Sequence, residues 1–137
     1  MKHLFVDTAG WMSMADGKDP MHASFRTARD EWLEAGGMLV VSNYILDETL
    51  TLIRMRLGLS AAEQWWEQVS GSLRCKTEWV TPDRVGRAVQ WFFKWKDQSF
   101  SFTDCTSFVV MKELGIEKAL TSDRHFLTAG FEIFSSS

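Results

Sequence analysis

The sequence predicts an α/β fold, a single domain with a mostly parallel, twisted sheet of about five strands and helices on both faces. The chain has 137 residues, of which 45% are hydrophobic, enough for one sizeable core and too few for two. Short apolar runs of strand length alternate with longer segments of helical periodicity. No repeat, low-complexity stretch or linker interrupts residues 1–137, so we expect one domain over the whole chain.

The predicted strands are short apolar runs separated by helical segments. They span Leu4 to Val6, Met38 to Val41, Thr77 to Val80, Lys118 to Leu120 and Phe131 to Phe134. Strands that alternate with helices pair in parallel, and such a sheet has both faces covered.

Helix boundaries follow from prolines, capping residues and glycines. The predicted helices run from Pro20 to Gly36, from Ser42 to Gly58, from Ser60 to about Gly71, from Pro82 to about Gln98, and from about Thr103 to Gly115. The segments expected to be weakly ordered are Ala15 to Pro20 and Ser135 to Ser137.

The composition indicates the cellular compartment in which the protein is expected and the kind of nucleic-acid contact it can make. The cysteines, Cys75 and Cys105, lack the spacing of a disulfide framework or a zinc site, which favours the reducing cytoplasm. The first apolar run is broken too early for a signal peptide, and no run reaches the ~20 apolar residues of a membrane span. A formal net charge of -3 argues against a broad basic nucleic-acid surface. Any nucleic-acid contact should therefore be local or bridged by metal.

Three acidic residues are predicted to converge on one edge of the sheet. Asp7 follows the first strand, Asp123 follows the fourth, and Asp104 begins the last long helix. In an open parallel sheet, the carboxyl ends of strands and the starts of helices share one rim. Asp104 can equally cap its helix, and Asp123 can equally be a turn residue. Asp7 is different, because an uncompensated carboxylate at the end of a buried strand is costly and calls for a cation or a helix N-terminus.

Glu48 is the fourth candidate, by its position on a predicted helix. It lies at the border of an apolar stripe and is expected to point partly inward, whereas Asp47 lies further from that stripe and is interpreted as a solvated charge. Carboxylates without a cysteine or histidine constellation suit Mg²⁺ or Mn²⁺ and not zinc. Two such ions activate water and hold a scissile phosphate, so the chemistry indicated is phosphoryl transfer.

Four motifs occur in order along the chain. They read Phe5-Val-Asp-Thr, Ser42-Asn-Tyr-Ile-Leu-Asp-Glu-Thr-Leu, Ser101-Phe-Thr-Asp-Cys-Thr-Ser-Phe and Leu120-Thr-Ser-Asp-Arg-His-Phe. Together they resemble the motifs of the PIN-domain family, in particular the VapC toxins of bacterial and archaeal toxin–antitoxin operons, over essentially the whole chain. The resemblance implies a metal-dependent endoribonuclease that leaves 5′-phosphates. It also implies a cognate antitoxin and a homodimer, and it assigns the metal-binding and catalytic acids to Asp7, Glu48, Asp104 and Asp123. Candidate accessory residues are Thr8, Thr121 and His125.

The aromatic residues suggest both a core and a contact surface. Trp65 and Trp66 belong to a helical stripe that is interpreted as core packing; the stripe also contains Ala62, Val69 and Leu73. A second aromatic group extends around its helix, so some members are expected to meet a partner, either a second copy or an antitoxin. This group comprises Trp91, Phe92, Phe93 and Trp95.

Several charged residues have two interpretations. His3, His22 and His125 lack metal-ligand spacing, so packing or surface roles are the default, although His125 is close enough in sequence to Asp123 to touch substrate. Asp97 is interpreted as a helix-end surface charge. The arginines either contact phosphates or lie on solvated helix faces; they are Arg54, Arg56, Arg84 and Arg87.

Four other functions compete with the toxin nuclease. A signalling receiver domain needs paired acids after the first strand, and a haloacid-dehalogenase-type phosphatase needs Asp-x-Asp there; Asp7 stands alone. A PIN-fold nuclease that processes RNA outside any toxin–antitoxin pair remains an alternative. So does a catalytically silent PIN scaffold, although all four acids are present.

Overall fold

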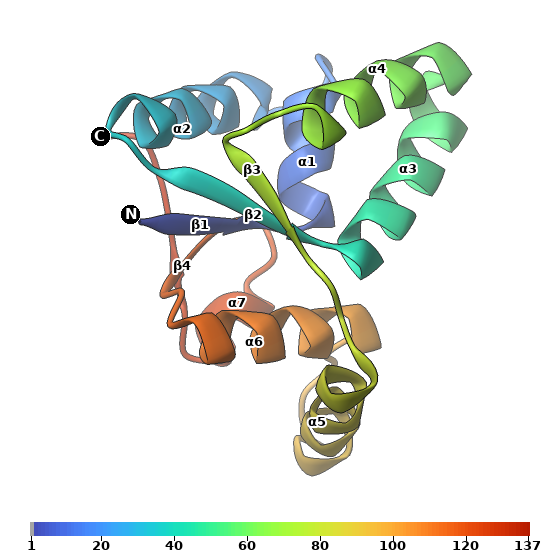
Figure 1. The fold of residues 1–137 in the computed structure, drawn as a ribbon, viewed down its shortest axis with the longest axis vertical. Helices are drawn as coiled ribbons and strands as arrows, with labels where there is room; N and C mark the ends of the chain where they lie inside the picture. Colours follow the sequence, from blue (N-terminus) through green and yellow to red (C-terminus); the bar gives the residue numbers. More distant parts are fainter. Residues whose placement is uncertain (1) are drawn as a thin grey trace.

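The computed structural model describes residues 2–137 and confirms the predicted α/β fold (Figure 1). One sheet has the order β3-β2-β1-β4-β5, and every neighbouring pair of strands is parallel. The strands are β1 (His3–Val6), β2 (Met38–Ser42), β3 (Cys75–Glu78), β4 (Lys118–Leu120) and β5 (Glu132–Ile133). Because β2 and β4 flank β1 on opposite sides, the winding of the chain reverses between β1 and β4.

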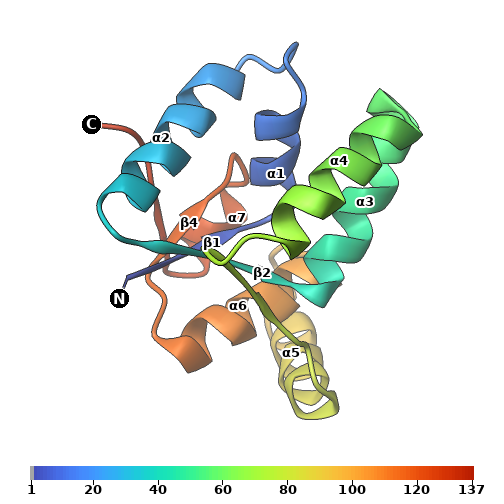
Figure 2. The ribbon, with the colours of Figure 1, turned by 45° about the horizontal axis from the view of Figure 1, so that its top comes forward.

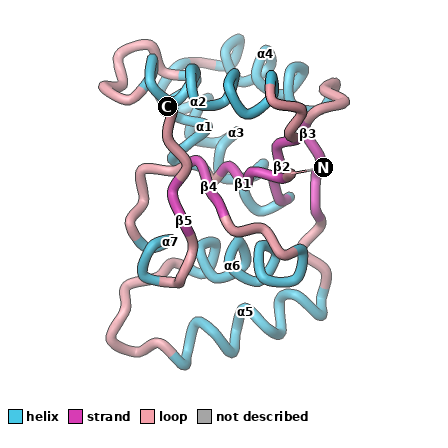
Figure 3. The backbone as a smooth tube through the Cα atoms, turned by 90° about the vertical axis from the view of Figure 1, so that its left-hand side faces the viewer, coloured by secondary structure: helices cyan, strands magenta, loops and turns pink. Residues whose placement is uncertain are grey.

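This reversal distributes the helices over both faces of the sheet. The helices are α1 (Thr8–Ala15), α2 (His22–Glu34), α3 (Asn43–Leu57), α4 (Leu59–Ser70), α5 (Pro82–Lys94), α6 (Phe102–Leu114) and α7 (His125–Thr128). Figure 3 shows α1 to α4 on one face and α6 and α7 on the other, with α5 outside α6. Ligands of such sheets bind beyond the carboxyl ends of the strands, where the winding reverses.

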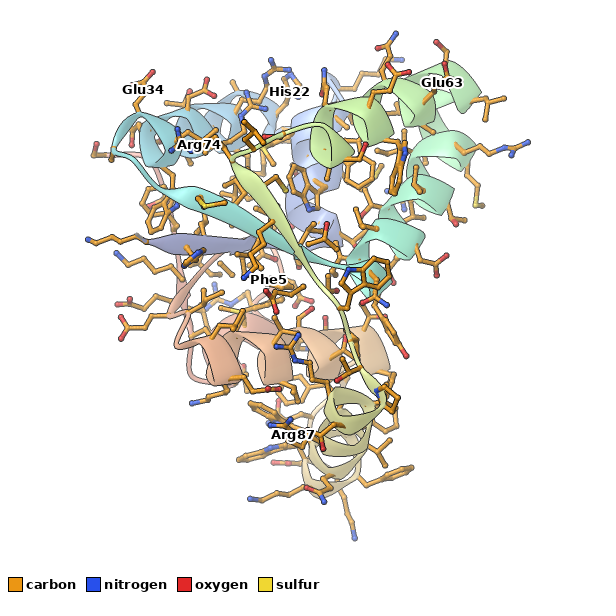
Figure 4. All side chains as sticks on the ribbon, viewed as in Figure 1. Phe5, His22, Glu34, Glu63, Arg74 and Arg87 are labelled. Carbon is orange, nitrogen blue, oxygen red and sulfur yellow. The ribbon has the colours of Figure 1, made fainter. Side chains whose placement is uncertain are left out.

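The central strands β1 and β2 are largely apolar, because helices cover both faces of the sheet there. Leu4, Phe5 and Val6 of β1 are fully buried, and Phe5, labelled in Figure 4, lies near the middle of the molecule. Residues 105–111 of α6 are all buried, since the sheet covers one side of this helix and α5 the other. The ring of Phe108 on α6 lies 5.1 Å from that of Phe126, centroid to centroid.

Capping residues explain where several helices begin and end. The Ser42 hydroxyl accepts a hydrogen bond from the Ile45 backbone N–H at 3.1 Å, and Thr81 precedes Pro82 at the start of α5. Gly115 ends α6 with a φ of 67°, a left-handed conformation that favours glycine. The predicted starts of α3 and α5 and the predicted end of α6 are confirmed.

The structure corrects several predicted boundaries. The prediction did not include α1 or α7, and α2 begins at His22, two residues after Pro20. The third strand is Cys75–Glu78 and not Thr77 to Val80, because its pairing with β2 runs from Leu39↔Cys75 to Ser42↔Glu78. Helix α5 ends at Lys94 and not near Gln98.

The core prediction for the tryptophan stripe is right for one side of α4 only. Trp65 is buried and lies edge-on to Trp11, with ring centroids 5.6 Å apart. Trp66 and Leu73 are exposed, by 42% and 94%, so their assignment to the core is wrong. Trp66 follows Trp65 by about 100° around the helix, which takes its side chain out of the buried face of α4.

The aromatic group of α5 is partly exposed, as the sequence suggested. Phe93 is 65% exposed and Trp95 42%, and Ala88 is the only buried residue of this helix.

Both cysteines are free. Among residues 2–137, no helix combines the length and apolar character needed to cross a membrane.

Candidate active site

A cavity of about 520 Å³ lies at the carboxyl edge of the sheet, and all four predicted acids line it. Asp7 precedes α1, Glu48 belongs to α3, Asp104 to the first turn of α6, and Asp123 to the loop between β4 and α7. These segments come from both sides of the reversal between β1 and β4. The convergence expected from the strand order is therefore present, and it includes a residue from the middle of a helix.

Asp7 is buried at the base of this cavity. One carboxylate oxygen caps α1 by accepting from the Gly10 backbone N–H at 2.9 Å, and the other accepts from the Thr121 hydroxyl at 2.7 Å. Burial raises the pKa of Asp7 from 3.8 to about 7, the two hydrogen bonds oppose the rise, and nearby Asp123 and Asp104 add to it. The cost of this buried negative charge is thus only partly offset by the protein itself.

Gly10 allows α1 to start this close to β4. A Cβ added at Gly10 would lie 2.2 Å from the Leu120 carbonyl oxygen and 2.9 Å from Val6 Cγ1. Helix α1 lies between α2 and α3 (Figure 2), so it has little room to move away. The glycine therefore fixes the distance between the Asp7 cap and the Thr121 segment.

Asp104 caps α6 and also lines the cavity, so a capping role does not exclude it from the group of acids. Its carboxylate accepts from the Ser101 backbone N–H at 3.1 Å, and its own N–H donates to the Ser101 hydroxyl at 2.9 Å, which forms a capping box. Burial, chiefly, raises the pKa of Asp104, with Asp123 adding to the rise. The Ser101 and His125 hydrogen bonds oppose it.

The segment after β4 brings a histidine to the acids. His125 Nδ1 lies 3.1 Å from Asp104 Oδ2 and 3.3 Å from Asp123 Oδ1. The His125 backbone N–H donates to Asp123 Oδ1 at 2.8 Å. Ligand spacing did not indicate this cluster. His125 lines the cavity beside Asp123, as its position in the sequence suggested, and its accessory role stays a prediction. The three members of the cluster can offer one ligand atom each, within 4.8 Å of one another.

Thr121 links the two sides of the cavity. Its hydroxyl donates to Asp7 and accepts from the Asp123 backbone N–H at 2.9 Å. Because this side chain is 1% exposed, the link is shielded from competing water. The position of Asp123 is in this way tied to the position of Asp7.

Glu48 was expected to point partly inward from α3; it does face the cavity, but its side chain is more exposed than expected. Its side chain is exposed instead of partly buried, yet it lines the cavity with the other acids, and Asp47 does not. The α3 stripe meets the core through Ile45 and Ile53, while Leu57 at its end is 36% exposed. Glu48 thus stands on the cavity side of α3 at the solvent boundary.

Two further charged residues line the cavity: Asp19, which the sequence did not single out, and Arg56, which it left between a phosphate contact and a solvated helix face. Asp19 lies in the segment that was expected to be weakly ordered, and its only signal was the turn-forming Asp-Pro pair. Arg56 brings a positive charge to a cavity otherwise lined by acids and neutral groups. By contrast, Arg84 and Arg87 pair with Glu113 at 3.2 and 3.4 Å. Arg87, labelled in Figure 4, thereby joins α5 to α6.

The donor set fits a hard divalent cation. Carboxylate oxygens from several segments are the ligands that Mg²⁺ and Mn²⁺ prefer. Thr8 also lines the cavity, and its buried hydroxyl has no hydrogen-bond partner among the described residues. A buried hydroxyl without a partner is unfavourable unless a bound group satisfies it. A cation would also relieve the repulsion between Asp7, Asp104 and Asp123.

Comparison with known proteins gives consistent matches. The family model of the PIN domain matches residues 4–132. The chain is 34% identical over 132 residues to the 23S rRNA-specific endonuclease VapC20 of Mycobacterium tuberculosis, and the match covers 93% of this chain and 95% of that protein. The crystal structure of M. tuberculosis VapC20, described as a sarcin–ricin loop cleaving toxin, matches with a TM-score of 0.84 at 33% identity over the same shares. FitAcB from Neisseria gonorrhoeae shares the fold, with a TM-score of 0.63 at 13% identity and 96% of both chains covered.

Proposed function

The chain belongs to the PIN-domain family, and we propose that it is a divalent-metal-dependent endoribonuclease, the toxin of a type II toxin–antitoxin pair. One observation carries the proposal: Asp7, Glu48, Asp104 and Asp123 reach the same cavity from four separate segments. A structural role for each acid would not require this convergence. The similarity to VapC20 extends over nearly the whole of both chains, which supports the same class of reaction.

In this proposal the acids hold Mg²⁺ or Mn²⁺. A bound ion of this kind polarises the phosphodiester and lowers the pKa of the attacking water. Thr121 holds Asp7 and the backbone of Asp123 in a fixed relation, and Ser101 orients Asp104. These hydrogen bonds keep the carboxylates in place before substrate arrives, which lowers the cost of organising the site.

The remaining cavity residues suit an RNA backbone. Arg56 is placed to contact a phosphate next to the one that is cleaved. Water attacks the phosphorus, the bond to the 3′-oxygen breaks, and the products carry a 5′-phosphate and a 3′-hydroxyl. No side chain forms a covalent intermediate in this scheme.

For the substrate, we propose a loop of ribosomal RNA. The described activity of VapC20, at 34% identity, makes a sarcin–ricin stem–loop the first RNA to test. A cognate antitoxin and a second copy of this chain are the proposed protein partners, and the exposed aromatics of α5 offer a surface for either. A processing nuclease outside a toxin–antitoxin pair would keep the same site but lack the antitoxin.

The test is cleavage of a labelled sarcin–ricin stem–loop and of intact ribosomes by purified protein, with Mg²⁺, with Mn²⁺ and with EDTA. We expect cleavage with metal, none with EDTA, and a loss of at least about 100-fold in Asp7→Asn. Asp97→Asn is the matched control, because Asp97 is exposed and does not line the cavity. Cleavage that persists in EDTA would rule out the metal mechanism, and RNA binding without cleavage would favour the silent scaffold.

A further inference from the structure

We propose that His125 Nδ1 is itself a metal ligand, so that the ion between Asp104 and Asp123 has a nitrogen donor and the site prefers Mn²⁺ over Mg²⁺. The inference rests on the proposed metal-dependent function and deepens it. It assigns to a histidine a role that the four-acid scheme does not contain.

The first argument is the spacing of the donor atoms. In an octahedral site with ligands about 2.1 Å from the ion, neighbouring ligand atoms lie about 3.0 Å apart. His125 Nδ1 is 3.1 Å from Asp104 Oδ2 and 3.3 Å from Asp123 Oδ1. Two of the three distances between donor atoms in the cluster therefore already match those of neighbouring ligands in such a site, and all three donors lie within 4.8 Å of one another.

The second argument is the orientation of the imidazole ring. His125 Nε2 lies 3.2 Å from the Ser99 hydroxyl, which can accept the Nε2–H hydrogen. With the proton on Nε2, the Nδ1 lone pair would be available to an ion held by the carboxylates, in place of the Nδ1–H that donates to Asp104 without metal. Metal-bound histidines commonly hold their second ring nitrogen in this way. Phe100 packs edge-on to the ring, at 5.3 Å between centroids, and limits its rotation.

The third argument is that the main chain already fixes part of the cluster. The His125 N–H donates to Asp123 Oδ1, and Ser101 fixes Asp104. Two of the three donors thus need little reorganisation to bind an ion. The unpartnered Thr8 hydroxyl in the same cavity independently indicates a missing ligand.

Metal selectivity follows from the nitrogen donor. Mg²⁺ is a hard ion that takes oxygen ligands and keeps much of its water. Imidazole nitrogen adds more to the affinity of first-row transition ions. Removing His125 should therefore weaken Mn²⁺ binding strongly and Mg²⁺ binding little. A histidine that only orients the two carboxylates would affect both ions equally.

The decisive measurement is pulsed EPR of the Mn²⁺-loaded protein without RNA, using samples with natural and ¹⁵N-labelled histidine. We expect a nitrogen coupling that changes with the label and disappears in His125→Asn. Asparagine keeps a side-chain N–H donor near the position of Nδ1 but has no nitrogen lone pair that can bind an ion, so it separates nitrogen coordination from hydrogen bonding. Loss of the coupling in a variant with wild-type circular dichroism supports the assignment.

Calorimetric titration with Mn²⁺ and with Mg²⁺ provides the second measurement. In His125→Asn we expect the Mn²⁺ dissociation constant to rise by about 10-fold or more and that of Mg²⁺ by less than about 3-fold. Equal weakening of both ions, or bound Mn²⁺ without histidine coupling, overturns the inference and leaves the four-acid metal site intact. Failure of wild type to bind either ion overturns the proposed function as well.

Discussion

Asp7 gives the most quantitative prediction, because its burial couples folding to pH. Its pKa rises from 3.8 in the unfolded chain to about 7 in the folded protein, so the folded state holds the proton more tightly. In metal-free protein the contribution of Asp7 to the free energy of unfolding should be highest below pH ~4, fall as the pH rises to ~7, and level off above it. At about 1.4 kcal/mol per pKa unit, the total loss is about 4 kcal/mol.

Asp7→Asn removes the charge that causes this loss. Asparagine can still cap α1 by accepting from Gly10, and its amide can donate to the Thr121 hydroxyl, so the neutral hydrogen bonds are largely retained. The variant should melt close to wild type near pH 4 and roughly 10 °C higher at pH 8 in EDTA. Added Mn²⁺ should raise the melting temperature of wild type more than that of the variant, since the ion binds and neutralises the native site.

The assay is a set of melting curves at pH 4, 6 and 8, each with EDTA and with Mn²⁺. Asp97→Asn is again the control, because it removes an exposed charge and should show no pH-dependent gain. A purely structural Asp7 predicts the opposite sign, since loss of a cap or buried partner costs about 1 kcal/mol or more. A variant that melts below wild type at pH 8, with an unchanged response to Mn²⁺, would refute the reasoning.

Two further predictions concern neighbouring positions on α3 and the packing of α1. Glu48→Gln should lower RNA cleavage by at least about 10-fold in a rate assay and leave the melting temperature nearly unchanged, whereas Asp47→Asn should keep full activity; the reverse pattern would contradict the assignment of the cavity side of α3. Gly10→Ala should destabilise by about 1–3 kcal/mol in denaturant unfolding, because the new Cβ would lie 2.2 Å from the Leu120 carbonyl oxygen. Gly86→Ala, inside α5 with nothing within 4 Å, should instead stabilise by about 0.5–1 kcal/mol, and a Gly10→Ala protein as stable as wild type would show that α1 can move.

The alternation of strand-length and helical segments in the sequence was enough to predict the parallel sheet. Helices α1 and α7 and the bounds of β3 were missed because their own residues carry little signal. Helix α1 has no polar face, because six of its eight residues are buried, so the amphipathic signal on which helix prediction relies is absent. Only the Asp7 cap indicated it. Helix α7 has four residues, too few to show any period. Strand β3 lies at the sheet edge, where its register depends on β2 and not on its own apolar residues.

The grouping of the acids could be predicted from the sequence, and so could the place of His125 beside Asp123. The contact of His125 with Asp104 could not, for a reason of geometry. Strand ends and helix starts share one rim in any parallel sheet, so Asp7, Asp104 and Asp123 follow from the order of elements. His125 meets Asp104 only because α7 turns back toward the start of α6. A contact between residues 21 positions apart has no linear signature, and no helical spacing or motif could indicate it.

The negative charge of the protein means that the site needs bound cations before it can bind an RNA backbone. A chain of formal net charge -3 with several carboxylates around one cavity repels a phosphate backbone, and Arg56 alone does not reverse that field. Divalent ions do, because each adds two positive charges where the phosphate must bind. Substrate affinity should therefore depend on metal even in a variant that cannot cleave. In the proposed function, one set of ions accounts for the folding cost of Asp7, the recognition of RNA and the chemistry.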